Sequence, residues 1–280
     1  MAVSVTGERA RPVTGPTGEV AWRGSSVLTQ TLVLTMRSLR ALVIDPRLIL
    51  ASMLGPLLML LVFSQIFASV INAPSFPADV RYIDFLIPAI LVNTVMQSAL
   101  HTATGLAQDA RNGIIARFRS LPIWLGSVLL ARSLADFFRS ALQLLLLLAA
   151  AFVLFGSRPA GGVAGVLAAW GLALVVGGGL GWIFIALACW VRNTELMQTV
   201  AGLVTFPLMF ASNAFVPVSG LPGWLQTVAR LNPMSYGIEA ARDLVLARPV
   251  GGGAIAAIAI SLLIAATAAT IAVRGFRRPM

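Results

Sequence analysis

The chain has 280 residues, of which 58% are hydrophobic and only 11% are charged, and its mean hydropathy is +0.91. A water-soluble domain of this size needs a charged surface, so the composition excludes that class and favours an integral membrane protein. The net charge is +10, and all twenty basic residues are Arg. In a membrane protein such a charge sets the orientation, and no nucleic-acid partner is expected.

Six stretches without formal charge divide the chain. They cover residues 48–78, 85–108, 140–157, 159–191, 196–229 and 249–273. Because about 20 apolar residues cross the bilayer core as a helix, we predict an all-α integral membrane protein with six transmembrane helices. Their predicted bounds are about 48–70, 83–107, 133–155, 163–190, 196–216 and 252–273.

The distribution of Arg predicts the orientation. With six crossings both termini lie on one side, and if that side is the cytoplasm, fourteen Arg fall in inner segments and five in outer ones. This asymmetry satisfies the positive-inside rule, so both termini are predicted to be cytoplasmic. Arg without Lys, together with abundant Ala and Gly, indicates a GC-rich bacterial genome and hence the plasma membrane of a bacterium.

The residues that are missing exclude several chemistries. Without Lys the chain cannot form the phosphate-binding loop of a nucleotide hydrolase or a Schiff base. A single Cys (Cys189) and a single His (His101) exclude a disulfide within the chain and argue against a metal cluster. We expect no catalytic residue, metal or cofactor in this chain.

The N-terminal region has two parts. Residues 1–24 mix Gly, Pro, Thr and charges, and are predicted to form a disordered cytoplasmic tail before a transmembrane domain over residues 25–280. An amphipathic helix begins near Ser25, with Leu28, Leu32 and Met36 on one stripe, and ends at Asp45-Pro46. It either lies in the cytoplasmic membrane interface or packs, as a soluble helix, on a partner.

Polar residues inside the spans are candidates for a substrate path. In the second span Asn93, Gln97 and His101 recur every four residues and share one face, which should point away from lipid. The alternative is that they hold helices together through hydrogen bonds. The possible path also includes Phe206, Met209 and Asn213 near the end of the fifth span.

Two segments outside the spans have distinctive patterns. After Gly113, the residues Ile114, Phe118 and Leu121 form a short apolar stripe that Pro122 ends. This segment is too short to be stable alone, so it either docks into a groove of another protein or packs on its own bundle. The other segment, "GWLQTVARLNPMSYGIEAARDLVLA", contains two short helices hinged at Asn-Pro, which predicts an interfacial or re-entrant hairpin on the outer side before the last span.

These segments resemble the membrane permeases of ABC-2-type exporters, especially the daunorubicin-resistance-like drug exporters. "DARNGIIARFRSLPI" is similar to the family's cytoplasmic coupling segment, and "FVPVSGLPGWLQTVARLNPMSYGIEAARDL" is similar to its stretch after the fifth span. The basic helix ending in Asp45-Pro46-Arg47 looks like its connecting helix. The resemblance covers nearly everything from about Ser26 to the C-terminus. Many relatives have more acidic residues where Asn112 and Ala116 stand here.

The resemblance implies a six-helix half-transporter that forms a homodimer or heterodimer and pairs with two copies of a separate ATP-binding subunit. ATP and Mg would then belong to that subunit, and membrane lipids would surround the permease. The implied docking residues of the coupling segment are Arg111, Asn112, Gly113, Ile114, Arg117, Phe118 and Arg119. The implied outer gate hairpin contains Trp224, Asn232, Pro233, Tyr236, Glu239 and Arg242. Local pairs of Glu239 and Arg242 would hold the hairpin in shape, and a role for Glu239 as a substrate cation site is the alternative.

The function expected from these features is ATP-driven export of amphiphilic drug-like or lipid-like molecules. Export of polysaccharide or teichoic acid uses the same fold and is the first alternative. A proton-coupled secondary transporter would need a buried carboxylate or an inverted repeat, and a membrane-embedded lipid-modifying enzyme would need clustered polar catalysts. Asp136 and Arg139, three residues apart at the entry of the third span, are expected to form a local ion pair.

Overall fold

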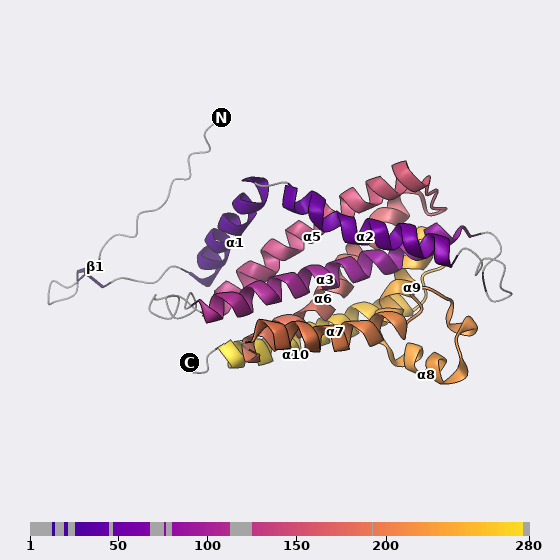
Figure 1. Ribbon diagram of the computed structural model, residues 1–280. Coiled ribbons are helices and arrows are strands. Elements are labelled where there is room, and N and C mark those ends of the chain that lie inside the picture. Colours follow the sequence, from indigo (N-terminus) through magenta and orange to yellow (C-terminus); the bar gives the residue numbers. More distant parts are fainter. Residues whose placement is uncertain are drawn as a thin grey trace, which may run out of the picture.

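The computed structural model describes residues 13–14, 20–21, 26–44, 47–67, 76, 80–112, 125–191 and 193–276. Five helices in these ranges are long and apolar enough to cross a membrane. They are α2 (Arg47–Ile66), α3 (Tyr82–Arg111), α5 (Leu125–Phe155), α6 (Gly162–Trp190) and α10 (Gly253–Phe276). Figure 1 shows them running side by side as one bundle. The helical membrane architecture is thereby confirmed for five of the predicted spans.

The predicted span at 196–216 has a different form from the other five. Its helix, α7 (Thr194–Phe210), has 17 residues and is followed by turns through residue 216. At 1.5 Å per residue this helix is about 25 Å long, shorter than the hydrocarbon core of a bilayer. The side chain of Asn193 starts α7 by accepting hydrogen bonds from two backbone N–H groups. The count of six crossings therefore stays a prediction.

Two helices extend well beyond their predicted spans. α5 begins at Leu125 rather than near residue 133, and α3 continues to Arg111 rather than ending near residue 107. An ion pair between Arg132 of α5 and Asp109 of α3 joins these extensions. The charges that interrupted the apolar pattern therefore do not interrupt the helices, because a helix continues when its charged side chains have partners.

Helix α6 lies at the centre and packs against α3, α10 and α9 (Pro233–Val245). Its glycines permit these contacts. A Cβ on Gly177 would lie 2.7 Å from the Cβ of Val95 on α3, and a Cβ on Gly179 would lie 2.7 Å from the carbonyl oxygen of Ser261 on α10. Helices in a membrane approach closely where small residues allow it, so these positions set the spacing of the core.

Helix α1 (Val27–Ile44) lies across one end of the bundle and packs mainly on α5 (Figure 1). Its buried side is polar, with Thr35 donating a hydrogen bond along its own helix to Thr31, whereas Leu28, Leu32 and Met36 are exposed. On a surface helix of a water-soluble protein, the apolar side would be buried and the polar side exposed. Two-residue strands, β1 (Val13–Thr14) and β2 (Val20–Ala21), pair antiparallel within the predicted tail, and the other residues of 1–24 lie outside the described ranges.

The other end of the bundle contains the predicted hairpin. Here the 3-10 turn η2 (Val218–Gly220) and α8 (Gly223–Leu231) lie outside the bundle, while α9 packs between α3, α6 and α10. We call the two ends of the bundle the α1 end and the α8 end. Figure 1 shows the last residues of α10 at the α1 end, opposite α8.

Candidate functional site

Asn232 forms the hinge between α8 and α9. Its Oδ1 accepts a hydrogen bond from the backbone N–H of Met234 at 3.0 Å and so caps α9. Its Nδ2 donates to the carbonyls of Leu208 at 2.7 Å and Ala211 at 3.0 Å, at the end of α7. Pro233 occupies the first position of α9, where a helix needs no N–H donor. The Asn-Pro pair therefore starts α9 and ties it to α7.

This double role predicts a graded loss of stability on substitution. Asn232→Ala removes the cap and leaves two carbonyls without their donor, so the free energy of unfolding should fall by about 2–3 kcal/mol. Asn232→Ser retains a capping oxygen but cannot reach α7, so its loss should be smaller. Thermal unfolding of the purified protein in detergent checks both variants. Two variants as stable as the parent protein would show that the hinge does not depend on this side chain.

Arg242 anchors α9 in the bundle. Only 5% of this residue is exposed. Its Nε donates to the carbonyl of Phe85 on α3 at 3.1 Å, its Nη2 donates to the carbonyl of Asn213 at 2.8 Å, and its Cζ lies 3.6 Å from the ring centroid of Phe85. Burial lowers the pKa of Arg242 to about 9, against the opposing effect of the carboxylates of Glu239 and Asp243, so the guanidinium keeps its charge at neutral pH.

Glu239 and Arg242 lie in different surroundings, although both belong to α9. No ion pair joins them in the described part of the chain, and Glu239 is exposed. The reason is geometric, because the guanidinium points into the bundle, where backbone carbonyls and an aromatic ring surround it.

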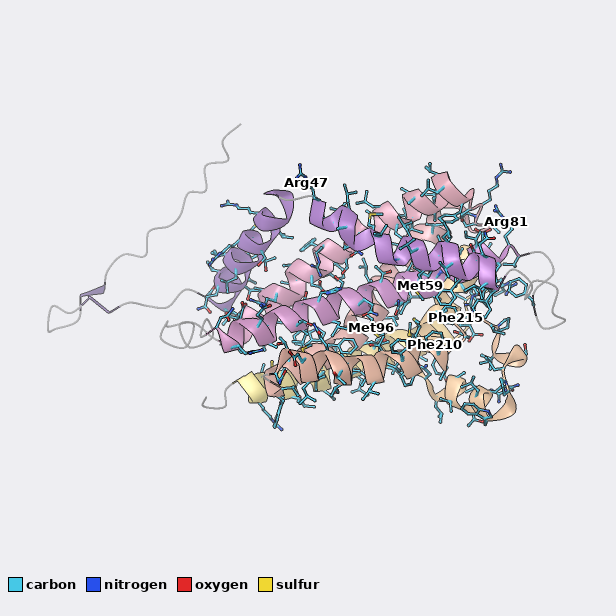
Figure 2. The ribbon with its side chains drawn as sticks, in the orientation of Figure 1. Arg47, Met59, Arg81, Met96, Phe210 and Phe215 are labelled. Atoms are coloured by element: carbon cyan, nitrogen blue, oxygen red, sulfur yellow. The ribbon has the colours of Figure 1, made fainter. Side chains whose placement is uncertain are left out.

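Seven aromatic residues cluster beside this anchor at the α8 end. Consecutive ring centroids in the cluster lie between 4.5 and 6.2 Å apart. The hydroxyl of Tyr82 donates to the carbonyl of Phe215 at 3.0 Å, which joins the start of α3 to the loop after α7. The cluster consists of Phe63, Phe67, Phe76, Tyr82, Phe85, Phe210 and Phe215. Figure 2 labels Phe210 and Phe215 within it.

Sequence reasoning did not find the aromatic cluster. Its members come from four separate segments, so the only sequence signal was the four-residue spacing of Phe63 with Phe67. Of the remaining hairpin residues, Trp224 is 73% exposed on α8, and Tyr236 donates its hydroxyl to the carbonyl of Arg230 at 2.7 Å. Trp224 thus lies outside the bundle, and Tyr236 stiffens the turn between the two helices.

The structure places the six possible path residues in different environments. Asn93 is buried and its Nδ2 lies 3.8 Å from the Sδ of Met59 on α2, whereas Gln97 is half-buried and His101 is exposed. Phe206 is exposed and stacks on Phe210 with centroids 5.9 Å apart. Met209 is half-buried, and the buried Asn213 accepts a hydrogen bond from Arg242 through its backbone. The Oδ1 atoms of Asn93 and Asn213 have no partner in the described ranges.

Most of the predicted coupling segment lies outside the described residues, namely Gly113, Ile114, Arg117, Phe118 and Arg119. Two members are described. Asn112 ends α3, and Arg111 donates through Nη1 to the Oγ1 of Thr194 at 3.1 Å. Because Thr194 is the first residue of α7, the end of α3 that enters the coupling segment is joined directly to α7.

These observations define a multi-pass helical membrane protein in which α9 of the hairpin packs into one end of the bundle while α8 lies outside it. The chain belongs to the ABC-2 type transporter family, whose sequence pattern matches residues 29–246. It is 31% identical over 244 residues to a daunorubicin resistance ABC transporter permease of Streptomyces coeruleorubidus, covering 85% of this chain and 84% of that protein.

Two further relatives are more distant. A permease of Mycobacterium tuberculosis named for doxorubicin resistance is 25% identical over 223 residues, 80% of this chain and 79% of that protein. The transport permease ycf38 of Porphyra purpurea is 28% identical over 199 residues, 70% of this chain and 67% of that protein. The chain is thus a membrane-spanning permease subunit of an ABC exporter, and its family implies a partner subunit that binds ATP.

Proposed function

We propose that this permease moves amphiphilic drug-like or lipid-like molecules out of a bacterial cell, across the plasma membrane. The observation that carries the proposal is the α8 end, where α9 and the aromatic cluster close an apolar bundle and Arg242 is the buried cation that holds them. The side chains that close this end are mostly apolar, which suits the apolar body of an amphiphile. The names of two relatives, for daunorubicin and doxorubicin resistance, support the same class of substrate.

The proposed membrane arrangement has six crossings, with α7 as the short one and with both termini in the cytoplasm. The exposed apolar stripe of α1 suits a helix that lies in the cytoplasmic interface with Leu28, Leu32 and Met36 towards lipid. Trp224 and Leu231 on α8 are exposed at the opposite end and suit the outer interface. The hairpin would then be the outer gate.

The proposed assembly contains two permease copies, identical or different, and two ATP-binding subunits that hold ATP and Mg. In this assembly α7 would carry movement from the ATP-binding subunits to the gate. At its start it contacts Arg111 through Thr194, and at its end Leu208 and Ala211 accept hydrogen bonds from Asn232. A shift of the coupling segment would therefore reach the hinge of the hairpin through one helix.

Phe118→Asp tests the docking step. A charge in the apolar stripe of the coupling segment should prevent its insertion into a groove of the ATP-binding subunit. We expect a subunit that co-purifies with the tagged protein from native membranes in mild detergent to be lost in Phe118→Asp and retained in Phe118→Leu. Retention in Phe118→Asp would move the docking site elsewhere. The proposed function would be overturned if no ATPase co-purified under any condition and transport did not depend on ATP.

A further inference from the structure

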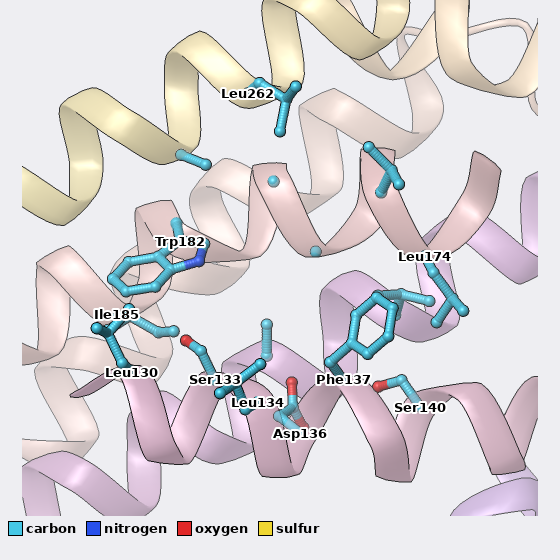
Figure 3. A pocket seen from close by; sticks show the side chains of 16 residues that line it. Leu130, Ser133, Leu134, Asp136, Phe137, Ser140, Leu174, Trp182, Ile185 and Leu262 are labelled. Carbon is cyan, nitrogen blue, oxygen red and sulfur yellow. The ribbon is translucent and has the colours of Figure 1, made fainter. Parts of the chain in front are cut away.

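A cavity of about 330 Å³ lies between α3, α5, α6 and α10, away from the hairpin. Figure 3 shows it from close by, with side chains of α5 on one side and Trp182 of α6 on the other. None of the six possible path residues lines it. Leu134, Phe137 and Leu262 line the cavity and are also exposed on the side of the bundle. The cavity therefore opens sideways, towards the lipid that would surround these helices.

The cavity exists because α6 has no side chain at Gly178. A Cβ at that position would meet no atom within 4 Å, whereas one at the adjacent Gly179 would meet Ser261 of α10. Along their whole lengths α5 and α10 make little contact with each other. The glycine and the separation of the two helices together leave room for a bound molecule.

Polar groups of α5 point into this otherwise apolar space. Ser140 is fully buried, and its Oγ has no hydrogen-bond partner in the described ranges, as is also true of the buried Oγ of Ser133. Asp136 accepts hydrogen bonds on Oδ1 from Ser98 at 2.7 Å and from Arg139 at 2.9 Å. The hydrogen bonds found for this carboxylate among the described residues are all on Oδ1. Figure 3 shows Ser133, Asp136 and Ser140 on the wall of the cavity.

The ionisable lining of the cavity is acidic. Asp136 is one of its lining residues, whereas Arg139, which pairs with its Oδ1, is not. Arg139 already balances the charge of this carboxylate, and a bound cation would add a second partner on the side that faces the cavity. Phe137 and Trp182 add aromatic faces, which attract a cation and stack on a flat apolar body. A hydrocarbon chain alone would leave both hydroxyls without partners.

We propose that this lateral cavity binds a cationic amphiphile, with its cationic nitrogen group at Asp136, Ser133 and Ser140 and its apolar body against Phe137 and Trp182. The proposal rests on the proposed function, since it assigns a substrate class to an exporter of amphiphiles. The volume lies at the lower end of the range for sites that hold drug-sized molecules. The molecule enters from the membrane rather than through the hairpin end.

The test measures binding to the full-length permease in lipid nanodiscs by fluorescence anisotropy. Rhodamine 6G is the cationic probe and Nile red is the uncharged one. Gly178→Leu places a side chain in the cavity, at a position where an added Cβ meets nothing within 4 Å. Gly171→Leu is the matched control, because a Cβ at Gly171 also meets nothing within 4 Å but lies outside the cavity. We expect Gly178→Leu to weaken rhodamine 6G binding at least about tenfold and Gly171→Leu to leave it unchanged.

A second variant tests the charge. Asp136→Asn should weaken the binding of rhodamine 6G by about tenfold or more and leave the weaker binding of Nile red unchanged. Equal binding by Gly178→Leu and Gly171→Leu would overturn the cavity as the site. Loss of both probes in Gly178→Leu, with no effect of Asp136→Asn, would overturn the cation contact at Asp136 and show that the cavity binds apolar molecules without regard to charge.

ATP-dependent efflux of rhodamine 6G by the complete transporter separates this proposal from the proposed function. Efflux by the parent protein that is lost in Gly178→Leu supports both. Efflux that persists in Gly178→Leu overturns the cavity as a transport site while the exporter stands. A third outcome is that Gly178→Leu abolishes rhodamine 6G binding but the parent protein shows no ATP-dependent efflux of any amphiphile. This result overturns the proposed function while the cation site stands.

Discussion

Replacing Arg242 by Met is expected to lower the free energy of unfolding by about 2–4 kcal/mol and to abolish transport. Hydrogen bonds to a charged group contribute about 1.5–3 kcal/mol each, and a desolvated cation–π contact contributes about 2 kcal/mol. Arg242 makes two such hydrogen bonds and one such contact, and the removal of a buried cation offsets part of their loss. Thermal unfolding in detergent and ATP-dependent efflux measure the two effects.

Glu239→Gln is the control for this experiment. Glu239 is exposed and forms no ion pair with Arg242 in the described residues, so its loss should change stability by less than about 0.5 kcal/mol. A Glu239→Gln variant as unstable as Arg242→Met, with no further loss in the double variant, would mean that a local pair holds the hairpin. Agreement with the expected values would show that α9 is held from inside the bundle.

Gly181→Ala is expected to destabilise the protein by about 1–3 kcal/mol, because the added methyl group has no space. A Cβ at Gly181 would overlap the Cβ of Ala99 on α3, and neither group has a rotamer that relieves the contact. Gly171→Ala on the same helix meets nothing within 4 Å and should instead stabilise α6 by up to about 1 kcal/mol. Melting temperatures of the two purified variants measure the difference.

A compensating change makes this prediction specific. Ala99→Gly removes the overlapping methyl group from α3, so it should recover at least about 1 kcal/mol of the stability lost in Gly181→Ala. If the double variant loses as much stability as the two single variants together, the contact of α3 with α6 is not the cause of the loss. Recovery would confirm that glycines of α6 set the spacing of the central helices.

Helix α7 gives these contacts a functional meaning. It is too short to be a typical span, yet it is joined at one end to Arg111 and at the other to Asn232. In the proposed mechanism this short helix would shift as one unit between the predicted coupling segment and the predicted gate, whereas the close packing of α3 and α6 restrains those helices. The proposed mechanism is therefore a movement of α7 against a fixed core.

Much of the fold could be predicted from the sequence alone. Long stretches without charge predicted the membrane helices, and the Asn-Pro hinge between two short amphipathic segments predicted α8 and α9. The ion pair of Asp136 with Arg139 was predicted and is confirmed at 2.9 Å. These features depend on neighbours along the chain, through helix length, capping and three-residue spacing, so local sequence determines them.

Other features were decided only by the tertiary structure. The partners of Arg242 come from α3 and the loop after α7, the aromatic cluster combines four separate segments, and the sideways cavity needs four helices and one missing side chain at Gly178. The spacing of residues along the chain does not predict these long-range contacts. They depend on how closely helices approach, and in a membrane that distance is set by which small residues face each other across the bundle.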